Sequence, residues 1–147
     1  MTAYTPIEVL LVEDDPGDVL MTREALSDRR IASRLNVVSD GVEALAYVRR
    51  EGVFGDAVRP DLVVLDLNLP RRSGREVLAD MKSDPELRDI PVVVLSTSSA
   101  EADVLDSYQL HANAFVTKPV DYDSFVSAVQ QIDDFFTGLV RLPHRGN

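Results

Sequence analysis

Acidic side chains stand directly after two apolar segments of this chain. Glu13 and Asp14 follow the apolar run Ile7–Val12, and Asp66 follows the apolar run Leu62–Leu65. Carboxylates that lie close together repel one another and cannot all stay ionised without a counter-charge. A hard divalent cation removes this conflict, because Mg²⁺ prefers carboxylate, carbonyl, water and phosphate oxygens as ligands. If the fold brings the two segments together, these residue types predict a magnesium site.

Asp66 could also react. An aspartate carboxylate beside Mg²⁺ can attack a phosphoryl group and become an aspartyl phosphate. The oxygens of the transferred group then need donors, and the hydroxyl of Ser96 and the ammonium of Lys118 follow two further apolar runs. The backbone carbonyl of Asn68, two residues beyond Asp66, could supply another metal ligand. Phosphoryl transfer depends mostly on positioning and electrostatics, so this short set is sufficient for it.

Each of these residues has a simpler explanation when it is considered alone. Asp15 precedes Pro16, a favoured first residue of a helix, and is most simply an N-cap. Asp66 alone could support the turn that follows it, and Lys118 alone could be a surface lysine. Acid, acid, hydroxyl and lysine after four segments are hard to obtain from capping alone, which favours the chemical interpretation of the set.

Strand-like segments alternate with helical patterns along the chain. The segments are short apolar runs, and the clearest are rich in Val, Ile and Leu without polar alternation, which is typical of strands buried on both faces of a parallel sheet. They are Ile7–Val12, Leu35–Val38, Leu62–Leu65, Val92–Leu95 and the weaker Ala114–Val116. Asp40 and Glu43 have the spacing of a capping box at the start of one helical pattern. We therefore predict an α/β fold with a five-stranded parallel sheet in a doubly wound (βα)5 arrangement.

The order of the strands decides whether the polar side chains meet. A common order for such sheets, flavodoxin-like, is 2-1-3-4-5, with the ligand crevice beyond the carboxyl ends of strands 1 and 3. In that order Glu13, Asp14 and Asp66 share one edge of the sheet. Ser96 and Lys118 then flank the three carboxylates.

The bulk composition excludes several classes of function. The chain has 147 residues, a usual size for one domain, and a net charge of -10. Nucleic acids and anionic membrane surfaces attract basic proteins, so we expect neither as a partner. There is no cysteine, no visible signal peptide and no apolar stretch near the roughly 18 residues of a membrane span. We therefore expect a cytoplasmic protein.

Four motifs resemble the receiver domain of two-component response regulators, the CheY-like family. They are VLLVEDD, LDLNLPRRSG, IPVVVLSTSS and AFVTKP, and they occur in this order within roughly residues 7 to 134. The resemblance implies that Glu13 and Asp14 are the acidic pair, with Asp14 a direct Mg²⁺ ligand. It further implies that Asp66 is the phosphoacceptor and that the carbonyl of Asn68 binds the metal. Lys118 matches the lysine of the family.

The same resemblance implies a switch. Ser96 occupies the position of the switch hydroxyl and Phe115 that of the switch aromatic residue. A phosphohistidine of a sensor histidine kinase would donate to Asp66. Movement of Ser96 and Phe115 would then change the face built by the fourth helix, fifth strand and fifth helix. On this interpretation the protein is a phosphoacceptor and not an enzyme with a separate substrate.

A finer similarity concerns the segments EGVFGDAVRPDLV, YQLHANAFVTKPVDYDSF and DDFF…VRLP. They are similar to the small response regulators that pair with bacterial phytochrome histidine kinases and have no output domain. We expect none here, because only about eight residues follow the last helical pattern. The expected division is a receiver domain over residues 1–134 and a C-terminal extension over 135–147.

The last helical pattern is longer than the sheet needs. From about Asp121 to Val140 it would measure roughly 30 Å, against about 17 Å for a five-residue strand. Its overhang could fold back onto its own domain, but a contiguous apolar patch more often marks an interface. We therefore predict a homodimer in which the interface includes Phe135, Phe136, Leu139, Val140 and Leu142.

Two rival functions remain. Mg²⁺-dependent phosphatases with an aspartate nucleophile resemble the pattern DxDx[TV], in which the second Asp transfers protons; Asn68 stands at that position and cannot do so. A phosphate-independent interaction domain would keep the fold only, and the retention of all the site residues disfavours it.

Overall fold

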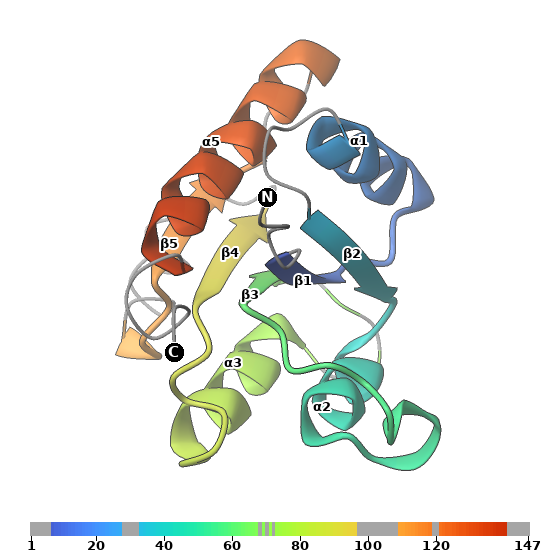
Figure 1. The fold of residues 1–147 in the computed structure, drawn as a ribbon, viewed down its shortest axis with the longest axis vertical. Helices are drawn as coiled ribbons and strands as arrows, with labels where there is room; N and C mark the ends of the chain where they lie inside the picture. The colour runs from blue at the N-terminus through green and yellow to red at the C-terminus, as the bar shows by residue number, and fades with distance from the viewer. Residues whose placement is uncertain are drawn as a thin grey trace, which may run out of the picture.

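The computed structural model is a five-stranded parallel sheet between two layers of helices (Figure 1). The strand order is β2-β1-β3-β4-β5 and every neighbouring pair is parallel, which confirms the predicted fold and order. The strands are β1 Ile7–Val12, β2 Ser33–Val38, β3 Leu62–Leu65, β4 Val92–Ser96 and β5 Ala114–Thr117. Strand β2 begins two residues before the predicted Leu35, because Ser33 pairs with Ile7 at the start of β1.

The structure describes residues 7–27, 33–67, 69, 71, 73–96, 109–118 and 121–140; for residue 133 and residues 135–140 it describes the backbone only. Within these ranges the helices are α1 Pro16–Ser27, α2 Gly41–Arg49, α3 Gly74–Ser83 and α5 Tyr122–Val140, with a 3-10 turn η1 at Gly52–Phe54. Asn68, the predicted fourth helix around residues 104–108, Leu142 and the apolar side chains of residues 135–140 lie outside the described part.

Helices cover both faces of the sheet, and each face has its own core. On one face α2 and α3 pack against alternate residues of the central strands, such as Leu10 of β1 and Val63 of β3 (Figure 1). On the other face α1 and α5 pack against the intervening residues, such as Val9 and Val64. This burial on both sides explains the unbroken apolar runs Leu62–Leu65 and Val92–Leu95.

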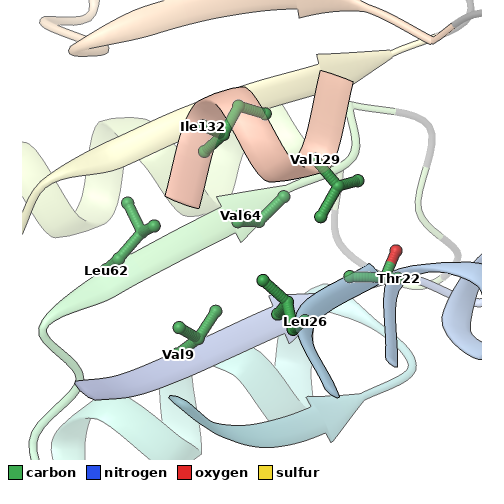
Figure 2. Close-up of a pocket in the computed structure, with 7 residues that line it drawn as sticks. All are labelled: Val9, Thr22, Leu26, Leu62, Val64, Val129 and Ile132. Carbon is green, nitrogen blue, oxygen red and sulfur yellow. The ribbon is translucent and has the colours of Figure 1, made fainter. Parts of the chain in front are cut away.

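A small apolar cavity remains between the sheet and the helices α1 and α5. It has a volume of about 20 Å³, and Figure 2 shows the side chains that surround it. The lining residues are Val9, Thr22, Leu26, Leu62, Val64, Val129 and Ile132. The hydroxyl proton of Thr22 is not available to a ligand there, because the hydroxyl donates to the backbone oxygen of Asp18 at 2.8 Å.

The helices that follow β2 and β3 begin with strong caps at one edge of the sheet. Asp40 accepts a hydrogen bond from the backbone N of Glu43 at 2.8 Å, which confirms it as the N-cap of α2. Ser73 and Glu76 form a reciprocal capping box at the start of α3. Rigid helix starts therefore surround the carboxyl ends of the strands. No helix among the described residues is long and apolar enough to cross a membrane.

Candidate functional site

The sheet brings the two acidic segments together. Val12 pairs with Leu65 in register, so β1 and β3 end at the same level, and the backbone N of Asp66 donates to the carbonyl of Val12 at 3.2 Å. As a result, carboxylate oxygens of Glu13, Asp14 and Asp66 all lie within 4.8 Å of one another. The structure thus places these three predicted site residues in one cluster at the carboxyl edge.

The three carboxylates differ in exposure. Glu13 and Asp66 are buried, with 3% and 8% of their surfaces exposed, whereas Asp14 is exposed. Glu13 is fixed by its backbone N, which donates to Val38 at 3.0 Å, and by its side chain, which accepts from the backbone N of Asp15 at 3.1 Å. The cluster therefore consists of two buried carboxylates, those of Glu13 and Asp66, and one carboxylate that faces solvent, that of Asp14.

Lys118, which follows the edge strand β5, supplies a positive charge to the acidic cluster. Its backbone N, directly after β5, donates to the carbonyl of Ser96 at 2.7 Å. Its side chain then passes β4, and its Nζ donates to Glu13 Oε2, to Asp18 Oδ2 at 2.8 Å and to Asp66 Oδ2 at 3.1 Å. This lysine is buried, with only 7% of its surface exposed, and is not the surface lysine of the simpler explanation.

Negative charge exceeds positive charge in this site. Burial raises the pKa of Glu13 to about 7, and the charge of Asp66 adds to the rise, while Lys118 only partly opposes it. Burial alone would lower the pKa of Lys118, but hydrogen bonds to Asp18 and Glu13 outweigh it and the pKa of this lysine rises. The rise for Glu13 therefore comes mainly from burial, whereas the rise for Lys118 comes from the several carboxylates around its one ammonium.

The donor set fits a hard divalent cation. The ligands that the cluster offers are carboxylate oxygens, without nitrogen or sulfur, which is the preference of Mg²⁺. A second positive charge would also compensate the surplus that one lysine leaves. Glu13, Asp14 and Asp66 are therefore the residues that would hold such an ion, together with the carbonyl of Asn68, which lies outside the described residues.

Ser96 lies on the strand next to that of Asp66, and Phe115 lies one strand further on. Leu65 pairs with Val94, so Ser96 is within one residue of the level of Asp66 on the neighbouring strand, and it is fully buried. Phe115, on β5, is partly buried and packs against the core beneath α2 and α3. The positions of both residues agree with the predicted switch pair, while their roles remain a prediction.

Two residues of the site have no counterpart in the sequence interpretation. Asp18 stands in the first turn of α1 and contacts Lys118, although 100 residues separate them. Gly74 opens α3 so close to the end of β3 that a Cβ there would lie 2.3 Å from the backbone oxygen of Asp66. An acid in the first turn of a helix normally indicates only a favourable dipole contact, so the pattern around Asp18 contains no sign of its partner.

An ion pair ties the loop after Asp66 to the neighbouring helix. Arg71 Nη1 lies 3.2 Å from Asp40 Oδ2, and Asp40 is the buried N-cap of α2. Arg71 has a φ of 67°, in the left-handed region that non-glycine residues rarely adopt. The N-cap of α2 therefore also contacts Arg71, which stands between β3 and α3.

Comparisons with known proteins agree with this geometry. Residues 9–130 match the family model described as the response regulator receiver domain. Response regulator Rcp1 of Synechocystis sp. is 43% identical over 138 residues, which are 94% of each chain. A solved structure of the phosphorylated cyanobacterial phytochrome response regulator RcpA is 45% identical with a TM-score of 0.90, covering 95% of this chain and 99% of that one. The Mn²⁺-bound form of Rcp1 is 43% identical with a TM-score of 0.89, covering 94% and 99%.

Proposed function

This chain belongs to the response regulator receiver domain family, and from that premise we propose that Asp66 accepts a phosphoryl group from a sensor histidine kinase in a Mg²⁺-dependent reaction. One observation carries the proposal: Asp66 lies within 4.8 Å of two other carboxylates and accepts a hydrogen bond from the buried Lys118 at 3.1 Å. This is the arrangement that an aspartate nucleophile, a cation and a phosphoryl oxygen together require.

Each residue of the site has a different role in the phosphoryl transfer. A carboxylate oxygen of Asp66 forms a bond to phosphorus while the bond from phosphorus to the histidine nitrogen breaks, and the nitrogen keeps the electron pair. Lys118 turns one N–H from Asp66 to an oxygen of the transferred group, and the hydroxyl of Ser96 donates to another. When bound by Glu13, Asp14, Asp66 and the carbonyl of Asn68, Mg²⁺ supplies positive charge for the phosphoryl oxygens.

Phosphorylation would change the conformation of the protein through the packing around Ser96 and Phe115. When Ser96 moves toward the phosphoryl group it vacates space near Phe115, and a close-packed interior does not keep such a void. Phe115, now partly buried on β5, turns inward to fill it. The face formed by the fourth helix, β5 and α5 changes as a consequence, and this face carries the signal.

The relatives suggest which kinase is involved. Phytochrome response regulators are similar to this chain over nearly their whole length, and the sequence segments quoted above have the same resemblance. We propose a bacterial phytochrome histidine kinase as the donor.

The length of α5 supports a homodimer. Its 19 residues extend about 28 Å, whereas the four residues of β5 span about 13 Å. The helix is anchored to the sheet by Phe125, Val129 and Ile132 and continues to Val140. Residues 1–134 would be the receiver domain, and residues 135–147 would extend it into an interface with a second copy.

A labelling experiment tests the function. The protein is incubated with Mg²⁺ and acetyl phosphate, and the modified residue is mapped by mass spectrometry. We expect one phosphoryl group on Asp66, none in Asp66→Asn, and wild-type labelling in Asp56→Asn, whose carboxylate is exposed on the loop after η1. Labelling of Asp66→Asn at the wild-type level would overturn the assignment.

A further inference from the structure

We propose that Asp18 is a positioning residue for Lys118: it holds the ammonium in place while Lys118 exchanges its contact with Asp66 for one with the phosphoryl group. The inference rests on the proposed phosphorylation of Asp66. It concerns a residue outside the cluster that would hold the metal, which consists of Glu13, Asp14 and Asp66 among the described residues.

The hydrogen-bond count of Lys118 requires an exchange. A lysine ammonium has three N–H donors, and three carboxylates already accept from this one. A phosphoryl oxygen can therefore be bound only when one carboxylate is released. The contact with Asp66, at 3.1 Å, is longer than that with Asp18, at 2.8 Å, and Asp66 is the residue that receives the group. Glu13 and Asp18 then remain as the two anchors.

Asp18 is suited to be the anchor that stays constant. Glu13 is also a candidate for the metal, so its charge is shared between the ion and Lys118. Asp18 is not part of that carboxylate cluster, and it stands on α1, a helix that Ala25 and Leu26 pack onto the sheet. Its side chain is 20% exposed, so water screens the contact only in part. We expect the contact with Asp18 to restrict the position of the Lys118 ammonium. One N–H of the ammonium can then donate either to Asp66 or to the phosphoryl oxygen.

A capping function does not account for Asp18. The N-terminus of α1 is already capped by Asp15, whose Oδ1 accepts from the backbone N of Gly17 at 2.8 Å and of Asp18 at 3.4 Å. The side chain of Asp18 instead directs Oδ2 to Lys118. A negative charge in the first helical turn is favourable by itself, but it does not require a partner on β5.

The test compares Asp18→Asn with Glu24→Gln. Both variants remove one negative charge from α1, but Glu24 is exposed and accepts from the hydroxyl of Tyr122 at 2.7 Å, away from Lys118. Labelling by acetyl phosphate is measured at saturating Mg²⁺ and saturating donor, so that weaker binding of either does not enter the rate. We expect the maximal rate of Asp18→Asn to fall about tenfold, as a small misplacement of a reacting group can cause. Glu24→Gln should keep the wild-type rate.

A spectroscopic readout separates positioning from general stability. With ¹⁵N-labelled lysine, the ammonium of Lys118 should give a slowly exchanging NMR signal in the wild type and in Glu24→Gln. In Asp18→Asn this signal should broaden or disappear while the backbone spectrum stays folded, and Asp18→Glu should recover part of both signal and rate. If Asp18→Asn does not fold, Asp18→Ser provides the same comparison.

The outcomes are distinguishable. A wild-type rate and an unchanged Lys118 signal in Asp18→Asn, with Asp66 labelled normally, would overturn this inference and leave the proposed function standing. Absence of labelling on Asp66 in the wild type would overturn both.

Discussion

The Nζ atom of Lys118 lies 3.1 Å from Oδ2 of Asp66, although 52 residues separate them and β4 lies between their strands. The same ammonium contacts Glu13 and Asp18, so a single buried cation joins β1, α1 and β3 to β5. A site held together in this way depends for its shape on the balance of charge, and a metal ion or a phosphoryl group would change that balance.

Removal of this cation should destabilise the fold in a Mg²⁺-dependent manner. Lys118→Met removes the ammonium that contacts the buried carboxylates of Glu13 and Asp66, and we expect a loss of about 3 kcal/mol in the free energy of unfolding. Mg²⁺ should reduce the loss, because it replaces the missing positive charge. Urea unfolding with and without Mg²⁺ measures this. Lys82→Met is the control, since Nζ of Lys82 donates to the carbonyls of Arg88 and Ile90, away from the acidic cluster. The stability that this variant loses should not depend on the ion.

The metal ligands should contribute unequally. Asp14→Ala removes a carboxylate that faces solvent and that we predict to bind the metal directly, so Mg²⁺ affinity should fall by at least about tenfold. Glu13→Ala should weaken binding less, because we expect Glu13 to act through water. Asp15→Ala, which removes the neighbouring acid that caps α1, is the control for charge. Equal affinities for wild type and Asp14→Ala in a titration would contradict the ligand assignment.

Gly74 should tolerate no side chain. A Cβ there would lie 2.3 Å from the oxygen of Asp66 and 2.6 Å from Cα of Leu67, and both are backbone atoms that cannot move aside cheaply. We expect Gly74→Ala to cost about 1–3 kcal/mol of stability and to slow phosphorylation, because Asp66 must shift. Gly55→Ala is the matched control: its nearest contact would be an ordinary 3.6 Å, and its φ of -56° suits alanine. Thermal unfolding that ranks the two variants equally would refute this.

Sequence and structure agree most closely where the signal is local or topological. The apolar runs predict each strand, and the choice of the common order 2-1-3-4-5 for a doubly wound sheet places Glu13 and Asp66 at one edge; the structure has this order. Ser73 and Glu76 also have the spacing of a capping box, which the structure shows at the start of α3. The roles of Asp18 and Gly74 could not be predicted, because the first depends on where Lys118 reaches across the sheet and the second on how closely α3 approaches the end of β3.

The cavity between α1, α5 and the sheet offers a route to higher stability. Val64 points into this space of about 20 Å³ (Figure 2), so Val64→Ile can place one methylene there and gain about 0.8 kcal/mol. Val63, the preceding residue of β3, faces the other core and is fully buried. Val63→Ile should therefore overpack that core and destabilise the protein by about 1–3 kcal/mol. Chemical denaturation of the pair checks the contrast; equal effects would show that the space is not usable.

The proposed homodimer should depend on the end of α5. Phe136 and Leu139 follow the anchoring residues Val129 and Ile132 at helical spacing, beyond the length that the sheet requires. If each residue of the predicted patch buries most of its side chain against a second copy, the gross gain is about 1.5–3 kcal/mol apiece before the cost of association. The double variant Phe136→Asp with Leu139→Asp should be a folded monomer.

The control places the same charges on the exposed side of α5. Ser127 and Gln131 are both exposed, so Ser127→Asp with Gln131→Asp should remain dimeric. Light scattering at tens of micromolar distinguishes the states, because twofold association doubles the mass of 16.2 kDa for one chain. A wild-type mass near that of a single chain would refute the dimer, and the phosphoacceptor assignment would be unaffected, since the acidic cluster and Lys118 lie within one chain.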